Sequence, residues 1–572
     1  LVSIQEVRQK VALAWRACQS YRRVTQEQVD AIVEAMAAAA RENASRLAEL
    51  AVQETGYGNA RDKLTKNLLA SDILPRRLRG MRTIGVVNEI PERKLVEIAE
   101  PVGVVAAILP TTNPTSTAIY KSLIALKAGN AIVISPHPRA RGCTCETAAV
   151  LAAAARKAGA PEGLIECIGT ATMEGTNALM RHEKTSLILS TGGAGIVKAA
   201  YSSGKPAYGV GPGNVPVAID ESADVARAVR DVVAGKSFDY GTVCSSEQTI
   251  VAVRGLREKI LEELKRNRAY FCTPEQTQAV ARTVLTPKLG VNPECVGQSP
   301  QKIARMAGFE VPADASILVV EIEGIGKEHP LSAEKLSPVL SLHFVKDWAG
   351  VLEAAEQTLR LGGLGHTCVL HAEDPARIRE YGLRMPAHRI LVNTPSPQGS
   401  TGITTDVFPA MTLGCGAMAG NATGDNIGPQ HLFHIKRIAM TVRSADQAFS
   451  SDTAKPAAST APDRQQIVTA VERYLAQRGV SLQEPGTEPI AAAVVDRFLA
   501  NRRPAAAAEA APTALATTAP PVSQPAVVDF VCEDDVRQAM RKSQKIYIGR
   551  KTILTPSARD LGAQYDVLVS VE

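Results

Sequence analysis

The chain has 572 residues, of which 45% are hydrophobic but only 4% aromatic, and its formal net charge is +6. This length exceeds one compact core, so we expect two or three domains with aliphatic interiors. The basic residues form no long run, which argues against nucleic-acid binding as the main function. No stretch of about 18 consecutive apolar residues occurs, so we expect no membrane span.

Residues 1–80 are rich in Ala, Glu, Arg and Leu with apolar spacings of three and four, which predicts helices. The first of these is amphipathic and lacks the basic and apolar regions of a signal peptide.

Ten cysteines are scattered over the chain, unlike the dense disulfide frameworks of small secreted domains, so we expect a reducing, cytoplasmic compartment. Cys143 and Cys145 have no second Cys or His cluster nearby, and we predict no metal site.

From about residue 95, short aliphatic runs bounded by Gly, Pro, Asn or Ser alternate with helical stretches. This alternation predicts parallel sheets covered by helices on both faces. A first domain is indicated by the runs VGVVAAILP, NAIVISP, LIECIG, TSLILST and VPVAI. A second is indicated by QTIVAV, ASILVVEI, LSLHFV, HTCVLHA and HRILVN. Two segments with polar and apolar residues in alternation, LVEIAEP and HIKRIAMTV, predict strands of a projecting sheet or edges for oligomer contacts.

The C-terminal part of the chain has a different composition. Residues 446–502 contain two stretches with apolar residues on one helical face, which predicts short amphipathic helices. Residues 503–526 are dominated by Ala and Pro and predict an extended, mobile linker. Residues 527–572 regain helix and strand character but are too few for a large core.

Two glycine-rich turns lie beside predicted strands. In LILSTGGAGIVKAA, the residues Thr191, Gly192 and Gly193 lie between a strand and a helix, where backbone N–H groups favour a phosphate. In YGVGPGNVPV, glycines precede another strand. Neither turn matches G-x-G-x-x-G or a P-loop, and each alone is more typical of a tight turn than of a ligand site.

Two side chains stand out by their surroundings. Asn113 lies in a Pro-flanked turn after a predicted strand, where open α/β sheets bind ligands, although it is equally suited to capping the next helix. Cys244 lies among small and hydroxylated residues in SFDYGTVCSSEQTIV. On its own it is compatible with a buried structural thiol, a metal ligand or a nucleophile, and burial is the commonest fate of a free Cys.

Eight motifs, taken together in their order, resemble the aldehyde dehydrogenase superfamily from about residue 1 to 440. They are LPTTNPTST, NAIVISPHPRA, STGG, GVGPGNVPV, YGTVCSSEQ, EKLSPVLS, GLGHT and PAMTLGCGAMAGN. Within that superfamily the match is to the CoA-acylating branch, including the aldehyde half of bifunctional aldehyde/alcohol dehydrogenases. The resemblance implies an α/β fold with two doubly wound parallel-sheet domains, a small projecting oligomerisation sheet and a mostly flexible C-terminal extension.

The same resemblance implies how the chain is divided. A nucleotide-binding domain for NAD and CoA is expected over 1–238, including oligomerisation strands at about 90–101. A catalytic domain is expected over 239–420. Residues 421–445 are expected to return to the nucleotide domain and add an oligomerisation strand, so that the enzyme is a homodimer or homotetramer.

The resemblance also assigns roles to the matched residues. Cys244 would attack the aldehyde carbonyl, and Asn113 would donate to the developing oxyanion beside the Cys244 backbone N–H. Glu334, in EKLSP, would hold the nicotinamide ribose. The other cofactor-binding residues that the matched turns imply are Pro110, Thr111, Thr112, Ser135, His137, Pro138, Thr191, Gly192, Gly193, Val210 and Gly211. Hydrolytic relatives have a Lys near the SPHP position, and its absence leaves NAD favoured over NADP but not fixed.

Val210 is an informative departure from the hydrolytic relatives, which have a Glu at this position. That Glu is the general base that activates water against the thioacyl intermediate, and Val has no lone pair for this role. A thiol needs less activation than water, because a thiolate is a good nucleophile. The substitution therefore favours transfer of the acyl group to coenzyme A.

We accordingly expect NAD-dependent oxidation of a short aldehyde to its acyl-CoA, with propionaldehyde as the first candidate and acetaldehyde as the second. One alternative is a hydrolytic aldehyde dehydrogenase, and another is a non-catalytic microcompartment assembly protein. The helices of 446–502 resemble encapsulation peptides, which would place the enzyme inside a bacterial microcompartment through a shell-protein partner. The alternative for these helices is a hairpin packed on its own enzyme.

Overall fold

The computed structural model describes residues 1–288, 290–449 and parts of 528–570. The chain forms two compact units, residues 1–448 and residues 449–572, which are treated separately below. Among the described residues, no helix combines the length and the apolar character needed to cross a bilayer.

The first unit begins with helices, as the apolar spacing of residues 1–80 predicts. Their bounds are α1 (Val2–Tyr21), α2 (Gln26–Glu42), α3 (Ala44–Thr55), α4 (Ala60–Leu68), a π-helical turn (Leu69–Ile73) and α5 (Leu74–Leu78). The start of α2 is fixed by a capping box in which the Thr25 hydroxyl accepts from the Gln28 N–H and the Gln28 side chain accepts from the Thr25 N–H.

A five-stranded parallel sheet follows, with the strand order β5-β4-β3-β6-β7. The strands are β3 (Val104–Ile108), β4 (Ala131–Ser135), β5 (Ile165–Cys167), β6 (Thr185–Thr191) and β7 (Ala207–Val210). The connecting helices are α6 (Pro114–Lys127), α7 (Arg141–Lys157), α8 (Met173–Arg181) and α9 (Ala194–Tyr201). From β3 the chain first adds β4 and β5 on one side, and it then adds β6 and β7 on the other side. Because such crossovers are right-handed, helices cover both faces, and a crevice opens at the carboxyl ends of β3 and β6.

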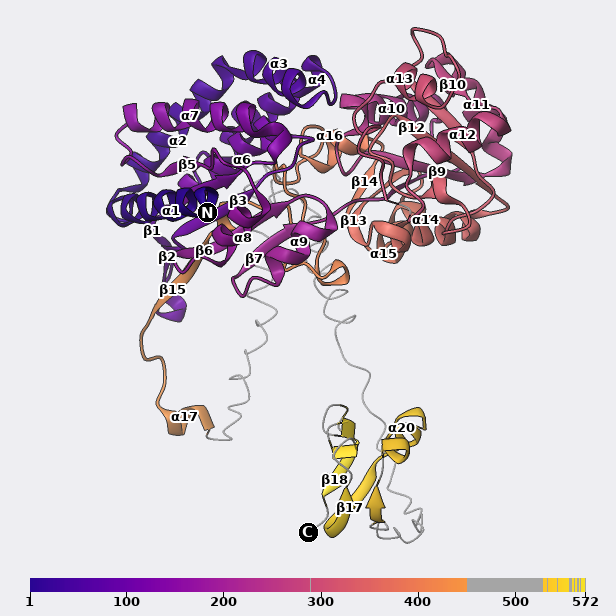
Figure 1. The fold of residues 1–572 in the computed structure, drawn as a ribbon. Coiled ribbons are helices and arrows are strands. Elements are labelled where there is room, and N and C mark those ends of the chain that lie inside the picture. Colours follow the sequence, from indigo (N-terminus) through magenta and orange to yellow (C-terminus); the bar gives the residue numbers. More distant parts are fainter. Residues whose placement is uncertain are drawn as a thin grey trace, which may run out of the picture. The chain divides into compact units, whose positions relative to one another are not determined.

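The second sheet has seven parallel strands in the order β10-β11-β12-β9-β8-β13-β14. They are β8 (Val215–Ile219), β9 (Glu247–Val253), β10 (Ala269–Phe271), β11 (Ile317–Glu321), β12 (Val339–Val345), β13 (Gly365–His371) and β14 (Ala387–Val392). The helices of this part are α10 (Val225–Ser237), α11 (Arg257–Arg266), α12 (Pro274–Val284), α13 (Pro300–Met306), α14 (Trp348–Gly362), α15 (Pro375–Arg384) and α16 (Ser396–Ser400). Figure 1 shows the two sheets, with their helices, side by side.

The strand order corrects the expected boundary between 1–238 and 239–420. Strand β8 lies inside the seven-stranded sheet, between β9 and β13, so the chain changes sheets at residues 211–214. A buried aliphatic strand has the same appearance in either sheet, and its neighbours are set by long-range pairing. The run VPVAI alone therefore could not show which sheet it joins.

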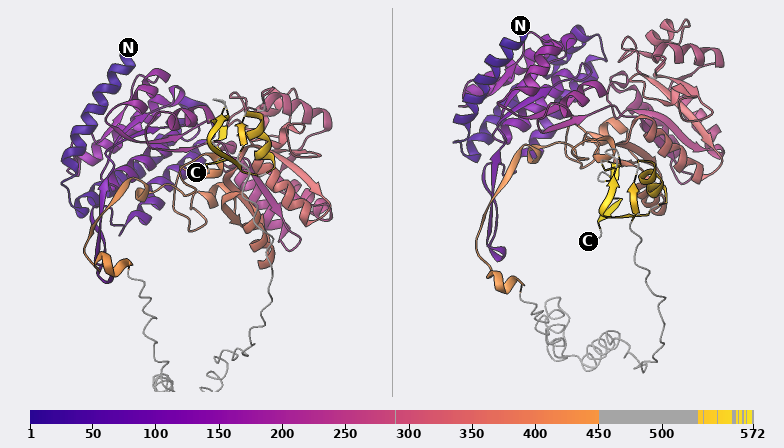
Figure 2. Two further views of the ribbon diagram at one scale, coloured as in Figure 1. Left: turned by 90° about the horizontal axis from the view of Figure 1, so that it is seen from below. Right: turned by 60° about the horizontal axis from the view of Figure 1, so that its bottom comes forward.

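A third, antiparallel sheet has the order β1-β2-β15. Its strands are β1 (Gly85–Ile90), β2 (Leu95–Pro101) and β15 (Phe433–Ala439), and β15 pairs with β2 from Phe433 opposite Pro101 to Ala439 opposite Leu95. The alternating segments LVEIAEP and HIKRIAMTV thus do form neighbouring strands. Figure 2 shows β1 and β2 extending as a hairpin, with β15 alongside.

The last helix to begin in the first unit is α17 (Ala445–Phe449), among the residues that the structure describes. The amphipathic helices and linker predicted over 450–527 lie outside the described residues. In the second unit, β16 (Val528–Val531), α20 (Glu533–Arg541), β17 (Ile546–Leu554) and β18 (Leu568–Ser570) form a parallel sheet in the order β16-β17-β18. Its small core contains Val531, Val536, Ala539, Ala558 and Val567, as the limited length of residues 527–572 leads one to expect.

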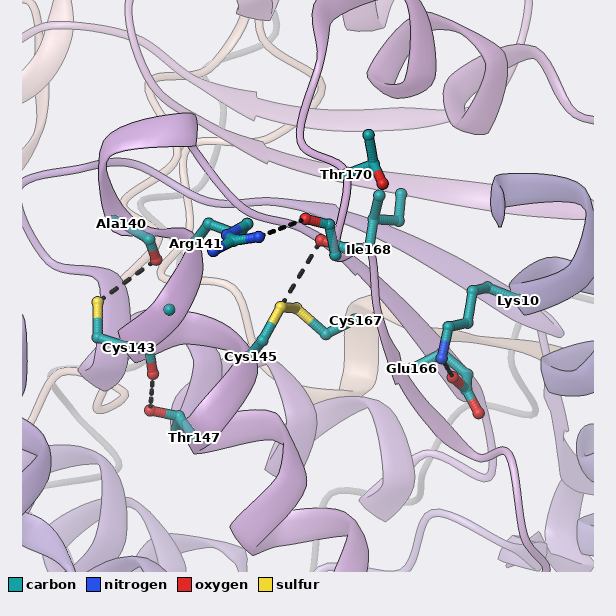
Figure 3. The surroundings of a disulfide bond; sticks show 12 residues. Lys10, Ala140, Arg141, Cys143, Cys145, Thr147, Glu166, Cys167, Ile168 and Thr170 are labelled. Carbon is teal, nitrogen blue, oxygen red and sulfur yellow. Dashed lines mark hydrogen bonds and ion pairs between the residues drawn. A yellow bond between two sulfur atoms is a disulfide. The ribbon is translucent and has the colours of Figure 1, made fainter. Parts of the chain in front are cut away.

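One disulfide differs from the expectation of free thiols. Cys145 on α7 is bonded to Cys167 at the end of β5, whereas the Cys143 thiol donates to the Ala140 carbonyl (Figure 3). The other cysteines that the structure describes are free. Scattered spacing could not reveal the bond, because it joins residues 22 positions apart that meet only when β5 packs beside α7. Among the described residues, no group of three or more His, Cys, Asp or Glu side chains is arranged to hold a metal.

Candidate active site

A cavity of about 870 Å³ lies where the carboxyl ends of the first sheet's strands meet the amino ends of the second sheet's strands. This volume is typical of a pocket for a cofactor or a small substrate. Every residue predicted for the site lines it: Pro110, Thr111, Thr112, Asn113, Ser135, His137, Pro138, Thr191, Gly192, Gly193, Val210, Gly211, Cys244 and Glu334. The structure therefore brings together residues that are far apart in the sequence.

The first sheet contributes the turns that follow β3, β4, β6 and β7. Each strand ends at or just before a Pro, Gly or hydroxylated residue. Because the strands are parallel, the chain leaves the sheet at the same edge each time. Gly193 is the N-cap of α9, and backbone N–H groups in this first turn are suited to a phosphate. Among the described lining residues of this edge there is no carboxylate, ammonium or guanidinium group.

Asn113 occupies the N-cap position of α6, but within the described structure its side chain makes no capping hydrogen bond. Its Oδ1 instead accepts from Lys66 Nζ at 2.5 Å, and its Nδ2 donates to Thr112 Oγ1 at 3.1 Å. Of the two interpretations that the sequence left open, capping of the next helix is therefore wrong. The amide lines the cavity that also contains Cys244.

Cys244 lies in the loop between a 3₁₀ turn (Phe238–Gly241) and β9. Burial raises the pKa of its thiol to about 12, and Glu334 and Cys415 add to this rise. The thiol is therefore protonated at neutral pH and needs a base to become a nucleophile.

His366, at the start of β13, lies where such a base could act. Its Nε2 lies 3.2 Å from Cys244 Sγ, and its Nδ1 lies 2.9 Å from Thr367 Oγ1. Arg389 Nε can only donate, and it does so to the same Thr367 oxygen at 3.2 Å. A remaining lone pair of that oxygen can accept from Nδ1–H, which leaves Nε2 as the acceptor facing the sulfur. Burial, together with Arg389, lowers the pKa of His366 well below its usual value, so the ring is neutral at pH 7 and its Nε2 lone pair carries no proton.

Glu334 and Gly213 form the adjoining wall. The Gly213 N–H donates to Glu334 Oε1 at 3.2 Å. A Cβ at position 213 would lie 2.3 Å from the Cys244 carbonyl oxygen and 3.1 Å from His366 Cγ, so only Gly fits between the nucleophile loop and β13. Burial raises the pKa of Glu334 to about 8, so the protonated form predominates at pH 7.

Val210 is buried and lines the cavity. Among the lining residues that the structure describes, Glu334 is the only one with a carboxylate. A base able to activate water at position 210 is therefore missing in the folded protein as well as in the sequence.

Sequence reasoning missed three residues behind the cavity wall. His366 is part of the motif GLGHT, but that motif was used only to recognise the resemblance. Arg389 and Lys66 belong to no quoted motif. Of the three, only His366 left a signal in the sequence, because it is a lone His in a matched motif. Its contact with Cys244 left none, since nothing in the sequence links two residues 122 positions apart.

Comparison with known proteins shows which family the chain belongs to. Residues 2–276 match the model described as the aldehyde dehydrogenase family. An acetylating aldehyde dehydrogenase from Geobacillus thermoglucosidasius is 51% identical, with a TM-score of 0.77 over 78% of this chain and 98% of that one. The bifunctional aldehyde-alcohol dehydrogenase AdhE of Escherichia coli K12 is 43% identical over 445 residues, which is 77% of this chain and 50% of AdhE.

A Rhodopseudomonas palustris propionaldehyde dehydrogenase, solved with bound CoA and an acylated cysteine, is more distant. It is 29% identical, with a TM-score of 0.69 over 76% of this chain and 97% of that one. The chain spans half the length of AdhE but nearly all of the two solved enzymes. The resemblance to propionaldehyde dehydrogenases is thus real but remote. The chain belongs to the aldehyde dehydrogenase family, within its CoA-acylating branch.

Proposed function

We propose that this protein oxidises a short aldehyde with NAD and transfers the acyl group from Cys244 to coenzyme A. The observation that carries the proposal is the Cys244–His366 pair, 3.2 Å apart, at the wall of a cavity whose single lining carboxylate is Glu334. The pair places a base beside the sulfur, whereas Val210 offers none to water on the opposite side of the cavity.

In the first step, Cys244 Sγ forms a bond to the aldehyde carbon as its proton moves to His366 Nε2. The carbonyl oxygen becomes an oxyanion, which the Asn113 Nδ2 and the Cys244 backbone N–H stabilise. When bound, NAD accepts the hydride from this carbon, which leaves a thioester on Cys244.

The cavity suits such a dinucleotide. The N-terminal turn of α9 offers N–H groups to the pyrophosphate, and the uncharged turns after β3 and β4 offer polar surface to the adenosine half. Glu334 would hold the nicotinamide ribose, and its protonated form can donate a hydrogen bond there.

His366 first releases to solvent the proton that it took from Cys244, which is the one proton that aldehyde oxidation sets free. The thiol of CoA then attacks the thioester, and its proton passes to His366 Nε2 and from there to the Cys244 sulfur as that sulfur leaves. Water competes poorly for two reasons. Val210 cannot accept a proton, and Glu334 is mostly protonated at pH 7 and accepts the Gly213 N–H. Both nucleotides would use one cavity in turn, which gives a ping-pong order.

The test is NADH formation from an aldehyde with and without CoA, with the product identified by mass spectrometry. We expect multiple turnovers and acyl-CoA only when CoA is present, and a single turnover in its absence. Rapid CoA-independent turnover to the free acid would instead establish the hydrolytic alternative. No turnover under either condition would favour the assembly-protein alternative.

The acyl chain length is a finer question. Sequence analysis favoured propionaldehyde, but the relative at 51% identity is an acetylating enzyme, whereas the propionaldehyde dehydrogenase is at 29%. We therefore propose a C2 or C3 aldehyde, with acetaldehyde now the stronger candidate. Values of kcat/KM for C2, C3 and C4 aldehydes with CoA present decide between them.

We keep encapsulation as a proposal for the C-terminal extension. The amphipathic helices that the sequence predicts over 446–502 would suit a groove on a shell protein of a cytoplasmic microcompartment. The sheet β1-β2-β15 is proposed as the oligomer contact, since Ile438, Met440 and Val442 are half exposed along its last strand and just beyond it. Deleting residues 445–572 should preserve activity and abolish co-localisation with shells, and retained co-localisation would exclude the extension as the address.

A further inference from the structure

A buried cluster of charges lies behind the Asn113 turn. Lys63 and Lys66 on α4 both donate to Asp239 Oδ2, and the three side chains are almost completely buried. Burial lowers the pKa of Lys66 to about 8 against the opposing charge of Asp239, so the ammonium form predominates at pH 7. Burying two cations with one anion is costly, which suggests that the cluster serves a purpose besides stability.

The two lysines hold different atoms of the same turn. Lys63 Nζ donates to the Thr112 carbonyl at 2.9 Å, whereas Lys66 Nζ donates to Asn113 Oδ1 at 2.5 Å. An ammonium group has only donors, so it must face the oxygen of the amide and never its nitrogen. Lys66 thereby fixes which way the Asn113 amide is turned.

The amide nitrogen has two N–H groups. One donates to Thr112 Oγ1 at 3.1 Å, so the second is left for the cavity that Asn113 lines. If the amide were reversed, its oxygen lone pairs would face the reacting carbonyl and oppose the charge that develops there.

The cluster also connects this turn to the nucleophile loop. Asp239 Oδ2 accepts from Thr242 Oγ1 at 2.6 Å, two residues before Cys244. Asp239 has φ +48°, a strained value for a non-Gly residue, and its Oδ1 accepts the Asn59 N–H at 2.8 Å. The two loops that carry the reacting sulfur and the oxyanion donor thus share one buried anchor.

We propose that Lys66 is a positioning residue of the oxyanion site, which locks the Asn113 amide so that an Nδ2 N–H faces the developing oxyanion. This inference rests on the role of Asn113 in the proposed function. Lys66 acts through Asn113 and does not touch the substrate.

The test is a double-mutant cycle in the full-length enzyme with the variants Lys66→Met and Asn113→Ala. Removing one oxyanion donor costs about 10²–10³-fold in kcat, and we expect that loss from Asn113→Ala. Lys66→Met should lose about 10²-fold in kcat while the KM values for aldehyde and NAD change by less than about threefold. In the double variant, Lys66→Met should add less than about threefold to the loss from Asn113→Ala.

Lys63→Met is the matched control. It removes the other buried cation and leaves Asp239 with one lysine, as Lys66→Met does, but it leaves Asn113 Oδ1 untouched. We expect a similar fall in the urea midpoint for both variants and a loss of less than about tenfold in kcat for Lys63→Met. Equal kcat losses for the two lysine variants, or full additivity in the cycle, would overturn the proposal.

Lys66→Gln covers the case in which Lys66→Met does not fold. It keeps an N–H donor for Asn113 Oδ1 and should retain kcat within about tenfold of the wild type. A loss as large as that of Asn113→Ala would contradict the proposal. Because NADH forms before CoA enters, the cycle can be measured even if the product proves to be free acid. Failure of this inference is therefore distinguishable from failure of the proposed acyl transfer.

Discussion

The two walls of the cavity are built from opposite kinds of surface. The first sheet presents backbone turns and small uncharged side chains from the carboxyl ends of its strands. The second sheet presents Cys244 and Glu334 from the amino ends of its strands, with His366 and Arg389 buried behind them. All of these second-wall groups have shifted pKa values, because they ionise where water is scarce.

We propose that this difference reflects a division of labour in which the first wall binds nucleotides and the second performs the chemistry. Substitutions on the second wall should change kcat, and substitutions on the first should change KM. The Asn113 turn is the exception, because it lies on the first wall but faces the reaction.

The largest effect is expected from Cys244→Ala, which removes the nucleophile. We expect kcat for aldehyde-dependent NADH formation to fall by about 10⁴-fold or more. NAD binding, followed by fluorescence titration, should stay within about twofold of the wild type because the first wall is intact. Persistence of substantial NADH formation would show that another group captures the aldehyde.

His366→Ala tests whether the second wall supplies the base. Loss of a general base typically costs about 10²–10⁴-fold, and we expect the fall in kcat with little change in KM. His371, at the other end of β13, is a matched control, because it is equally buried but does not contact Cys244. If His371→Ala lowers kcat as much as His366→Ala, the loss of kcat comes from disturbed packing of β13 and not from a lost proton acceptor.

Val210→Glu places a carboxylate on the uncharged first wall, which would then carry a base of its own. We expect CoA-independent NADH turnover to increase by about tenfold or more, with free acid as the new product. Val210→Gln has the same size but no basic oxygen, and it should remain CoA-dependent. Free acid from both variants would mean that access of water, not a base, limits hydrolysis.

The thiol of Cys244 should show its raised pKa in alkylation by iodoacetamide. Only the thiolate reacts, so below a pKa of about 12 its rate rises about tenfold per pH unit. We expect this rise to continue from pH 7 to pH 10 without cofactors, measured by mass spectrometry of the Cys244 peptide. A plateau near pH 9, as for an ordinary thiol of pKa about 8.5, would show that the sulfur is not shielded as the structure indicates.

The smallest effect is expected on the first wall. Ser135→Ala removes a hydroxyl that lies 2.9 Å from Thr176 Oγ1 and lines the cavity. Loss of one hydrogen bond of about 1 kcal/mol predicts a rise of about fivefold in the KM for NAD with kcat unchanged. Ser190→Ala, on β6 of the same sheet but outside the cavity lining, should leave both values unchanged.

The sequence was sufficient for features whose signal is local. Aliphatic runs predicted the strands, and the family resemblance carried by the turns after them named the side chains that gather at one edge of the first sheet. Asn113 illustrates the limit of this reasoning, because its place at the end of β3 was visible but its choice between capping and the cavity was not. That choice depends on Lys66, which comes from a helix 47 residues earlier.

Long-range pairing set everything that sequence reasoning missed. Strand β8 joined the second sheet through β9 and β13, although its residues resemble those of the first. His366 reached Cys244 only because β8, β9 and β13 are neighbours whose amino ends lie together. The bond between Cys145 and Cys167 likewise required β5 to pack beside α7. None of these contacts leaves a periodic pattern along the chain.

Strand β15 has a consequence for any shortened form of this protein. It covers one side of β2 over seven paired residues, so a chain cut before Phe433 would leave a row of N–H and C=O groups without partners. An open strand edge of this kind is a template for aggregation. A soluble catalytic fragment must therefore retain Phe433–Ala439, however much of the remaining C-terminal sequence is dispensable.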